Sequence, residues 1–98
     1  MMTEPVERRR YRVRGRVQGV GFRAFVWRQV QRLEVAGWVR NRRDGTVEVL
    51  ADGTAEDHVT LYAMLEKGPS LSRVDGVDVA PEGREHEELV GFAVVPDA

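Results

Sequence analysis

The chain has 98 residues, with 15 basic and 16 acidic side chains, a net charge of −1 and no cysteine. This length suits one domain with a single core, and the missing cysteine excludes a disulfide framework, a thiolate metal site and a cysteine nucleophile. The N-terminus, MMTEPVERRR, has no apolar run, and no stretch approaches the ~20 apolar residues that span a bilayer. We therefore expect one cytoplasmic domain over residues 1–98, with 1–8 as a flexible N-terminal tail.

The charge is divided between the two halves of the chain. Residues 1–49 carry twelve arginines against five acidic residues, a net +7, and residues 50–98 carry three basic against eleven acidic residues, a net −8. A basic half is typical of a protein with an anionic partner, such as phosphate, nucleic acid or an acidic ligand. The division also fits a fold in which both halves mix and the charges only solvate the surface.

The chain opens with a predicted strand and a predicted helix. Residues 10–17 alternate between arginine and mostly apolar side chains, the period of a strand with one buried face and, here, one solvated arginine face. From Phe22 the apolar residues recur at helical spacing, through Val26 and Val30, and predict an amphipathic helix of roughly 14 residues that ends near Gly37. Trp27, on this helix, and Trp38 are interpreted as packing residues.

The segment from Gln18 to Arg23 joins that strand to that helix and contains two glycines, Gly19 and Gly21. A helix N-terminus offers free backbone N–H groups and a partial positive charge, and glycines let an anion approach them closely. Arg23 adds a planar guanidinium that can grip two phosphate oxygens. Taken alone, the loop fits a phosphate site and a ligand-free tight turn equally well.

Two other phosphate-binding motifs do not explain this loop. The Walker pattern needs a Gly-Lys-Ser/Thr ending, which is missing. Gly19-x-Gly21-x-x-Ala24 matches the dinucleotide fingerprint loosely, and Asp44 lies about 20 residues further on, where that fingerprint expects an acid. However, a chain this short cannot build a doubly wound sheet, and Asp44 is better explained by the Asp44-Gly45 turn.

The remaining elements follow in order. Asp44-Gly45 predicts an antiparallel hairpin of strands at about 37–43 and 46–52. Thr54 is a candidate N-cap for a second helix that Gly68-Pro69 ends. A fourth strand with a kink or bulge near Gly76, a polar loop over 81–89 and a short last strand within 90–95 complete the chain. The apolar stripe of the second helix is predicted at Ala55, Val59, Tyr62 and Leu65.

This order, β-α-β-β-α-β with a short final strand, predicts the fold class. It is the order of the split βαβ, ferredoxin-like α+β sandwich, in which an antiparallel sheet carries two helices on one face. That fold hosts many functions, so the function has to come from the site.

Two blocks of the sequence, GRVQGVGFR (Gly15–Arg23) and GWVRNRRDGTVEV (Gly37–Val49), resemble the acylphosphatase family. The resemblance continues more loosely through GPSLSRVDGVDV and GFAVV and covers about Arg10 to Val95. Residues 70–72 (SLS) and the acidic loop PEGREHEEL depart from the family pattern, outside the matching blocks. They bear on substrate preference and local stability rather than on the chemistry.

The resemblance implies a single-domain hydrolase that converts acyl phosphates to a carboxylate and inorganic phosphate, on the ferredoxin-like fold predicted above. It places the catalytic arginine at Arg23 and the catalytic asparagine at Asn41. The implied phosphate cradle consists of Gln18, Gly19, Val20, Gly21, Phe22 and Arg23.

The residues suit that chemistry without a metal or another cofactor. His58, in the second helix, and His86, in the polar loop, are interpreted as exposed side chains outside any motif, and no spacing suggests a metal site. The carboxylate leaving group departs without a general acid, because carboxyl pKa values lie near ~4. The hypothesis is that the cradle and Arg23 hold the phosphoryl group while Asn41 orients the attacking water. An amide is too weak to be a base, so either a phosphate oxygen accepts the proton or no base is needed.

Two rival functions share the fold. RNA-recognition domains stack bases on aromatic residues of the sheet, but the first strand offers arginines there and the usual Gly-aromatic pattern is missing. A non-catalytic ligand-sensing domain is supported by the fold alone. We therefore expect a monomer whose partners are a small acyl phosphate and the inorganic phosphate product, with no membrane or nucleic-acid partner.

Overall fold

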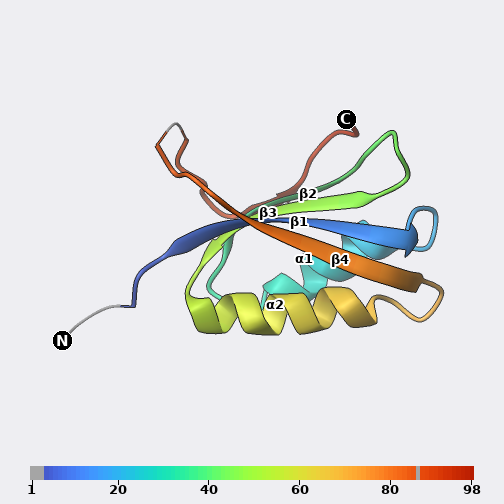
Figure 1. Ribbon diagram of the computed structural model, residues 1–98, viewed down its shortest axis with the longest axis horizontal. Coiled ribbons are helices and arrows are strands. Elements are labelled where there is room, and N and C mark those ends of the chain that lie inside the picture. The colour runs from blue at the N-terminus through green and yellow to red at the C-terminus, as the bar shows by residue number, and fades with distance from the viewer. Residues whose placement is uncertain (1–3, 86) are drawn as a thin grey trace.

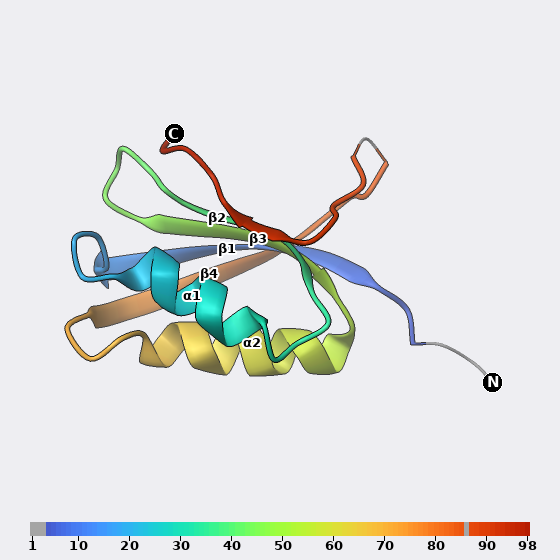
Figure 2. The ribbon, with the colours of Figure 1, turned by 180° about the vertical axis from the view of Figure 1, so that it is seen from behind.

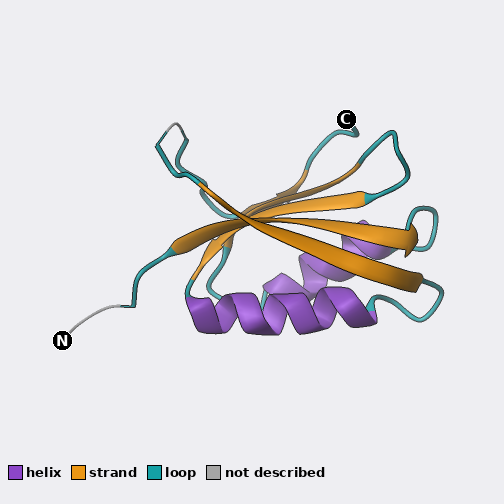
Figure 3. Ribbon diagram, in the orientation of Figure 1, coloured by secondary structure: helices purple, strands orange, loops and turns teal. Residues whose placement is uncertain are grey.

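The computed structural model describes residues 4–85 and 87–98, and in that part of the chain two helices lie on one face of a five-stranded sheet (Figures 1 and 3). The described helices are not long and apolar enough to cross a membrane. The elements in chain order are β1 (Glu7–Arg16), α1 (Phe22–Val30), β2 (Ala36–Asn41), β3 (Val47–Gly53), α2 (Ala55–Lys67), β4 (Arg73–Glu82) and β5 (Phe92–Val94).

The strand order in the sheet is β4-β1-β3-β2-β5. The first four strands pair antiparallel, which confirms the ferredoxin-like prediction, while β5 pairs parallel to β2 and makes the sheet mixed. Strands β1 and β2 are separated by β3, so the loop after β1 and the end of β2 lie at the same end of the sheet on alternate strands (Figures 1 and 2).

The core lies between the sheet and the two helices. Tyr11 and Val13 of β1 point to the helix side and are almost fully buried, as the alternation in the sequence predicts. Arg10, Arg12 and Arg14, at the alternate positions of the strand, lie on the other, open face of the sheet. The buried apolar cluster contains Tyr11, Val13, Val17, Phe22, Val26, Val30, Val39, Val47, Val49, Ala51, Leu61 and Leu65.

The first helix is shorter than the periodicity predicts. Helix α1 has nine residues and ends at Val30, whereas the pattern indicates about 14. After Val30 the chain tightens, because the N–H of Arg32 bonds to the carbonyl of Gln29 at 3.2 Å and that of Leu33 to Val30 at 2.9 Å. The tighter turn lets Leu33 continue to pack against the core, which extends the apolar period beyond the helix.

The hairpin is also shorter than predicted, although its place is correct. Strand β2 ends at Asn41 and β3 begins at Val47, so the connection is longer than a two-residue turn. The N–H of Arg42 donates to the carbonyl of Thr46 at 2.9 Å, and the carboxylate of Asp44 accepts from the Thr46 N–H at 3.0 Å. Asp44 therefore serves the turn, as the sequence predicts.

Helix α2 begins and ends where the sequence predicts. Thr54 and Asp57 form a reciprocal capping box, with the Asp57 N–H donating to the Thr54 hydroxyl at 3.1 Å, and Gly68 follows the last helical residue.

The buried face of α2 differs from the predicted stripe. His58 is fully buried and Val59 is 69% exposed, so both predictions were wrong. His58 is buried because Tyr11 and the Glu7 carbonyl satisfy its two ring nitrogens, at Nδ1 and, at 2.7 Å, at Nε2.

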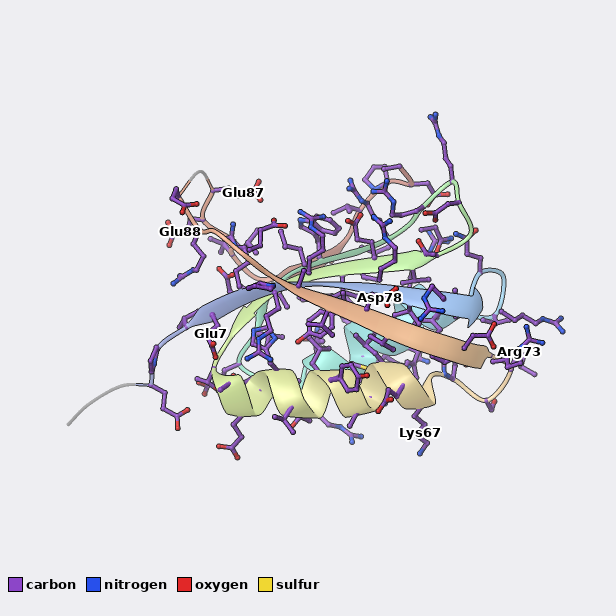
Figure 4. All side chains as sticks on the ribbon, viewed as in Figure 1. Glu7, Lys67, Arg73, Asp78, Glu87 and Glu88 are labelled. Carbon is purple, nitrogen blue, oxygen red and sulfur yellow. The ribbon has the colours of Figure 1, made fainter. Side chains whose placement is uncertain are left out.

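The predicted fourth strand is confirmed, with a register shift where β4 passes Arg14 and Gly15, next to Gly76. The described residues between β4 and β5, 83–85 and 87–91, lie away from the loop after β1, and Figure 4 shows Glu87 and Glu88 at the opposite end of the sheet from Arg73. His86, interpreted from the sequence as an exposed loop residue, lies outside the described residues.

The N-terminal tail is shorter than residues 1–8. Strand β1 begins at Glu7, and the buried guanidinium of Arg8 donates to Asp52 at 2.8 Å. Residues 1–3 lie outside the described part of the chain.

Candidate active site

One pocket brings together the predicted loop and the predicted asparagine. It has a volume of about 350 Å³ and lies at the end of the sheet where the loop after β1, the β2–β3 turn and the C-terminal tail converge (Figures 1 and 2). We call it the loop pocket. Its lining residues are Val17, Gly19, Gly21, Phe22, Arg23, Ala24, Asn41 and Val94.

The backbone of the loop requires both of its glycines. Gly19 has φ 73° and Gly21 has φ 77°, in the left-handed region that other residues rarely adopt. A side chain at either position would meet no atom within 4 Å, so backbone strain rather than lack of space selects glycine. Gly21 is the N-cap of α1, with no side-chain capping bond and no acidic residue in the first turn. The free N–H groups and partial positive charge of this helix end therefore favour an anion.

The side chain of Gln18 ties the loop to the β2–β3 turn. Its amide nitrogen donates to the carbonyl oxygens of Arg42, at 2.7 Å, and Thr46, at 2.9 Å. Both amide hydrogens are therefore used on the turn that follows Asn41. Val20 packs against the core. Of the six predicted cradle residues, these two do not line the pocket, and only their backbone N–H groups remain for a ligand.

Arg23, in the first turn of α1, holds its guanidinium at the pocket. Its Nη1 donates to the carboxylate of Asp97 at 3.1 Å, and both side chains are substantially exposed, at 41% and 62%. An exposed pair of this kind contributes little binding energy, typically about 0.2–1 kcal/mol. Arg23 therefore already binds a carboxylate that another anion can replace.

Asn41 is the last residue of β2, and the C-terminal tail runs beside it. The N–H of Ala98 donates to the Asn41 carbonyl at 3.0 Å, and the N–H of Arg43 donates to the Ala98 carbonyl at 2.8 Å. The backbone of Asn41 is thus held on one side by β3 and on the other by the C-terminal tail. Asn41 lines the loop pocket together with residues of the strand-to-helix loop. Such fixation suits a group that has to orient a small molecule.

The arginines that flank Asn41 are held by one buried carboxylate. Glu48 is 1% exposed and accepts hydrogen bonds from Arg40 at 2.7 Å, from Arg42 at 3.1 Å and from Arg10. Burial alone raises the pKa of Glu48, but these hydrogen bonds outweigh it and hold the pKa at about 2. Glu48 therefore offsets one of the positive charges near Asn41 and fixes the positions of Arg40 and Arg42.

Sequence reasoning missed four residues at the site: Asp97, Val17, Ala24 and Val94. Val17, Ala24 and Val94 lie inside or beside the matched blocks but carry no polar group, so nothing in the pattern singles them out. Asp97 lies in the short tail after β5, and the pairing of β5 with β2 brings that tail to Arg23. To predict Asp97 at the site, one needs to know which strands pair, and the residue types alone do not give that.

Comparisons with known proteins show which family and fold the chain shares. The family model described as Acylphosphatase matches residues 9–94. An acylphosphatase of Koribacter versatilis is 60% identical over 84 residues, covering 83% of this chain and 76% of that relative. An acylphosphatase of Nitratidesulfovibrio vulgaris is 56% identical over 80 residues, covering 78% and 80%. The crystal structure of the Bacillus subtilis acylphosphatase superposes with a TM-score of 0.84 at 37% identity, covering 93% of this chain and 99% of that one.

Proposed function

The chain belongs to the acylphosphatase family, and from this premise we propose that it hydrolyses acyl phosphates to a carboxylate and inorganic phosphate, using Arg23 and Asn41. One observation carries the proposal: Arg23 and Asn41 come from different elements and line one pocket with Gly19 and Gly21. A free helix N-terminus with an arginine in its first turn is an anion site, and an amide beside it can hold a water.

The phosphoryl group binds at the N-terminus of α1. Backbone N–H groups of residues 18–23 surround it, and the Arg23 guanidinium leaves Asp97 to donate to its oxygens. These donors stabilise the charge that spreads over the equatorial oxygens as the bond to the leaving group lengthens. Because the backbone donors are fixed by the fold and Arg23 moves when the substrate binds, before the chemical step, little reorganisation is needed at the transition state.

The attacking water is positioned by the side-chain amide of Asn41. The amide oxygen accepts one hydrogen bond from the water and so aims a lone pair of the water oxygen at phosphorus. The P–O bond to the acyl group then breaks, and its electron pair leaves with a carboxylate that is stable as an anion, because carboxyl pKa values lie near ~4. The water proton passes to a phosphate oxygen, which needs no protein base. The products are a carboxylate and inorganic phosphate.

Hydrolysis of benzoyl phosphate by the purified chain, with a metal chelator present, tests this proposal. Arg23→Ala and Asn41→Ala are each expected to lower kcat/KM by at least ~10²-fold, the usual cost of losing one preorganised group at the transition state. Arg32→Ala, an arginine just after α1 that is exposed and outside the pocket, is the matched control and is expected to keep wild-type activity. Near-wild-type turnover by either site variant, with the fold intact by circular dichroism, would overturn the assignment.

The site is built from one chain, so the proposal needs no second copy, and we expect a monomer by size-exclusion chromatography with light scattering. We propose the small acyl phosphate as the only partner needed for turnover. Activity that appears only at concentrations where the chain self-associates would contradict this.

A further inference from the structure

A second hollow adjoins the loop pocket and is mostly apolar. It has a volume of about 440 Å³ and is lined by Ala24, Trp27, Arg28 and Val94. Ala24 and Val94 also line the loop pocket, so the two hollows share a wall. We call these four residues the acyl shelf. Each hollow is within the range of small-molecule sites, about 300–1,000 Å³.

Local structure explains why the shelf stands beside Arg23. Trp27 and Arg28 follow Ala24 by three and four positions on α1, so all three lie on one face of the helix, just beyond the first turn. Val94 is the last residue of β5, the edge strand that packs next to α1. The shelf therefore begins where the helix N-terminus ends.

The large apolar groups of the shelf are not covered by the fold. The sequence favoured a packing role for Trp27, but its side chain is 43% exposed and does not belong to the buried core, and Val94 is 47% exposed. Single exposed apolar residues are common on protein surfaces. These two differ because they are neighbours in one hollow that opens into an anion site. An exposed apolar patch in such a place is typical of a ligand-binding surface.

We propose that the shelf binds the acyl group of the substrate, with the Trp27 ring as its platform, and that the chain prefers acyl phosphates with aromatic or bulky apolar acyl groups. The inference rests on the proposed function. An acyl phosphate has a charged end, which the helix N-terminus and Arg23 bind. Its acyl end is uncharged, and the carbonyl is the only polar group there that needs a hydrogen-bond partner. The uncharged end has to leave the loop pocket, and the shared wall of Ala24 and Val94 leads it to the indole.

Kinetics with two substrates test the shelf. Trp27→Ala is expected to raise KM for benzoyl phosphate roughly 5- to 10-fold, the range for losing an aromatic contact together with its apolar area. The rise for acetyl phosphate is expected to stay below about twofold, because a methyl group covers little of the ring. Trp27→Phe should restore most of the benzoyl phosphate affinity. Val59→Ala, an exposed apolar residue on α2, is the matched control for loss of surface area. Equal effects of Trp27→Ala on both substrates would overturn the proposal.

A binding measurement keeps this inference separate from the proposed function. In Trp38→Phe, Trp27 is the only tryptophan left in the chain. Benzylphosphonate, which cannot be hydrolysed, is expected to quench its fluorescence with saturation, and methylphosphonate is expected to bind with little quenching. The shelf is overturned if benzylphosphonate causes no quenching although inorganic phosphate still inhibits turnover, which shows that the anion site itself is intact. Quenching without any turnover of acyl phosphates retains the shelf and overturns the proposed function instead.

Discussion

Arg23 is expected to bind two anionic groups in turn: the carboxylate of Asp97 in the free protein and the phosphoryl group of the substrate. Its contact with Asp97 is a single hydrogen bond of 3.1 Å between exposed groups. In the proposed mechanism a phosphoryl group offers Arg23 a second acceptor oxygen and also binds the helix N-terminus, so we expect it to displace Asp97 at a small cost.

Removing the competing carboxylate should therefore tighten substrate binding. We expect Asp97→Asn to lower KM for acyl phosphates, by at most about fivefold, since an exposed ion pair contributes no more than about 1 kcal/mol. The value of kcat should change little, because Asp97 has left Arg23 before the chemical step. Steady-state kinetics at low ionic strength measure both constants. A rise in KM would mean instead that Asp97 holds Arg23 ready for the substrate.

At the scale of elements, His58 joins α2 to β1. Its Nε2 faces the Glu7 carbonyl at 2.7 Å and therefore carries the proton, which leaves Nδ1 to accept from the Tyr11 hydroxyl. Burial raises the pKa of Tyr11 to about 12, so that hydroxyl remains a donor. One buried side chain thus satisfies polar groups at two positions of β1.

Replacing His58 by phenylalanine should test this link. His58→Phe keeps a ring of similar size but leaves the Tyr11 hydroxyl and the Glu7 carbonyl without their partner. We expect the free energy of unfolding to fall by about 2 kcal/mol, within the usual cost of about 1–3 kcal/mol for a buried unpaired polar group. Urea unfolding measures this, and Val59→Ala, the exposed neighbour, is the control. Unchanged stability of His58→Phe would contradict the link. A loss of kcat in the folded variant would also contradict it, because it would indicate a role in catalysis rather than in stability.

The sequence predicted best those elements whose ends are set by local chemistry. Thr54, Asp57 and Gly68 fix α2 through caps that neighbouring residues complete. The end of α1 was missed because Leu33 keeps the helical period while the backbone has already turned. His58 was misread because its burial depends on Tyr11, which is 47 positions away in the chain. These contacts are tertiary and leave no local pattern.

The candidate site divides in the same way. The glycines and Arg23 of the loop fit an anion site and a ligand-free turn equally well, and the family resemblance supplied both the phosphate-site interpretation and Asn41. That these groups meet in one pocket depends on β3 lying between β1 and β2 and on Gln18 bonding to the turn, and neither follows from spacing along the chain. The tail and the acyl shelf depend on β5 pairing with β2, which the sequence left open.

In the whole molecule, folding brings the basic first half of the chain into contact with the acidic second half. Strand β1, rich in arginine, lies between β3 and β4, and its arginines pair with acidic residues of both. Arg10 bonds to Glu48 and Glu82, and Arg14 bonds to Asp78. The open face of the sheet is therefore a network of ion pairs rather than a bare arginine surface. The acidic partners of the arginines on this face include Glu48, Asp52, Asp78 and Glu82.

The same network should determine how the fold responds to acid. Glu48 has a pKa of about 2 in the folded chain, against an ordinary value of 4.5. Between these two values the unfolded chain binds more protons than the folded chain, so the free energy of unfolding decreases as the pH falls from 4.5 to 2. Above pH 4.5 the contribution of Glu48 is fully present, and this difference in pKa corresponds to about 3 kcal/mol.

Glu48→Gln isolates this contribution, because glutamine has nearly the same shape and no charge. We expect the variant to be less stable than wild type by about 3 kcal/mol at pH 7, and the difference to shrink below about 1 kcal/mol near pH 2, where about half of the wild-type carboxylate is protonated. Urea unfolding of both proteins across this range measures the difference directly. Asp78→Asn is the matched control, since Asp78 lies on the same face as Glu48 and both Asp78 and its partner Arg14 have half or more of the side chain exposed, so it should change stability little at either pH. A difference for Glu48→Gln that stays constant from pH 7 to pH 2 would show that packing at Glu48, rather than its charge, stabilises the sheet.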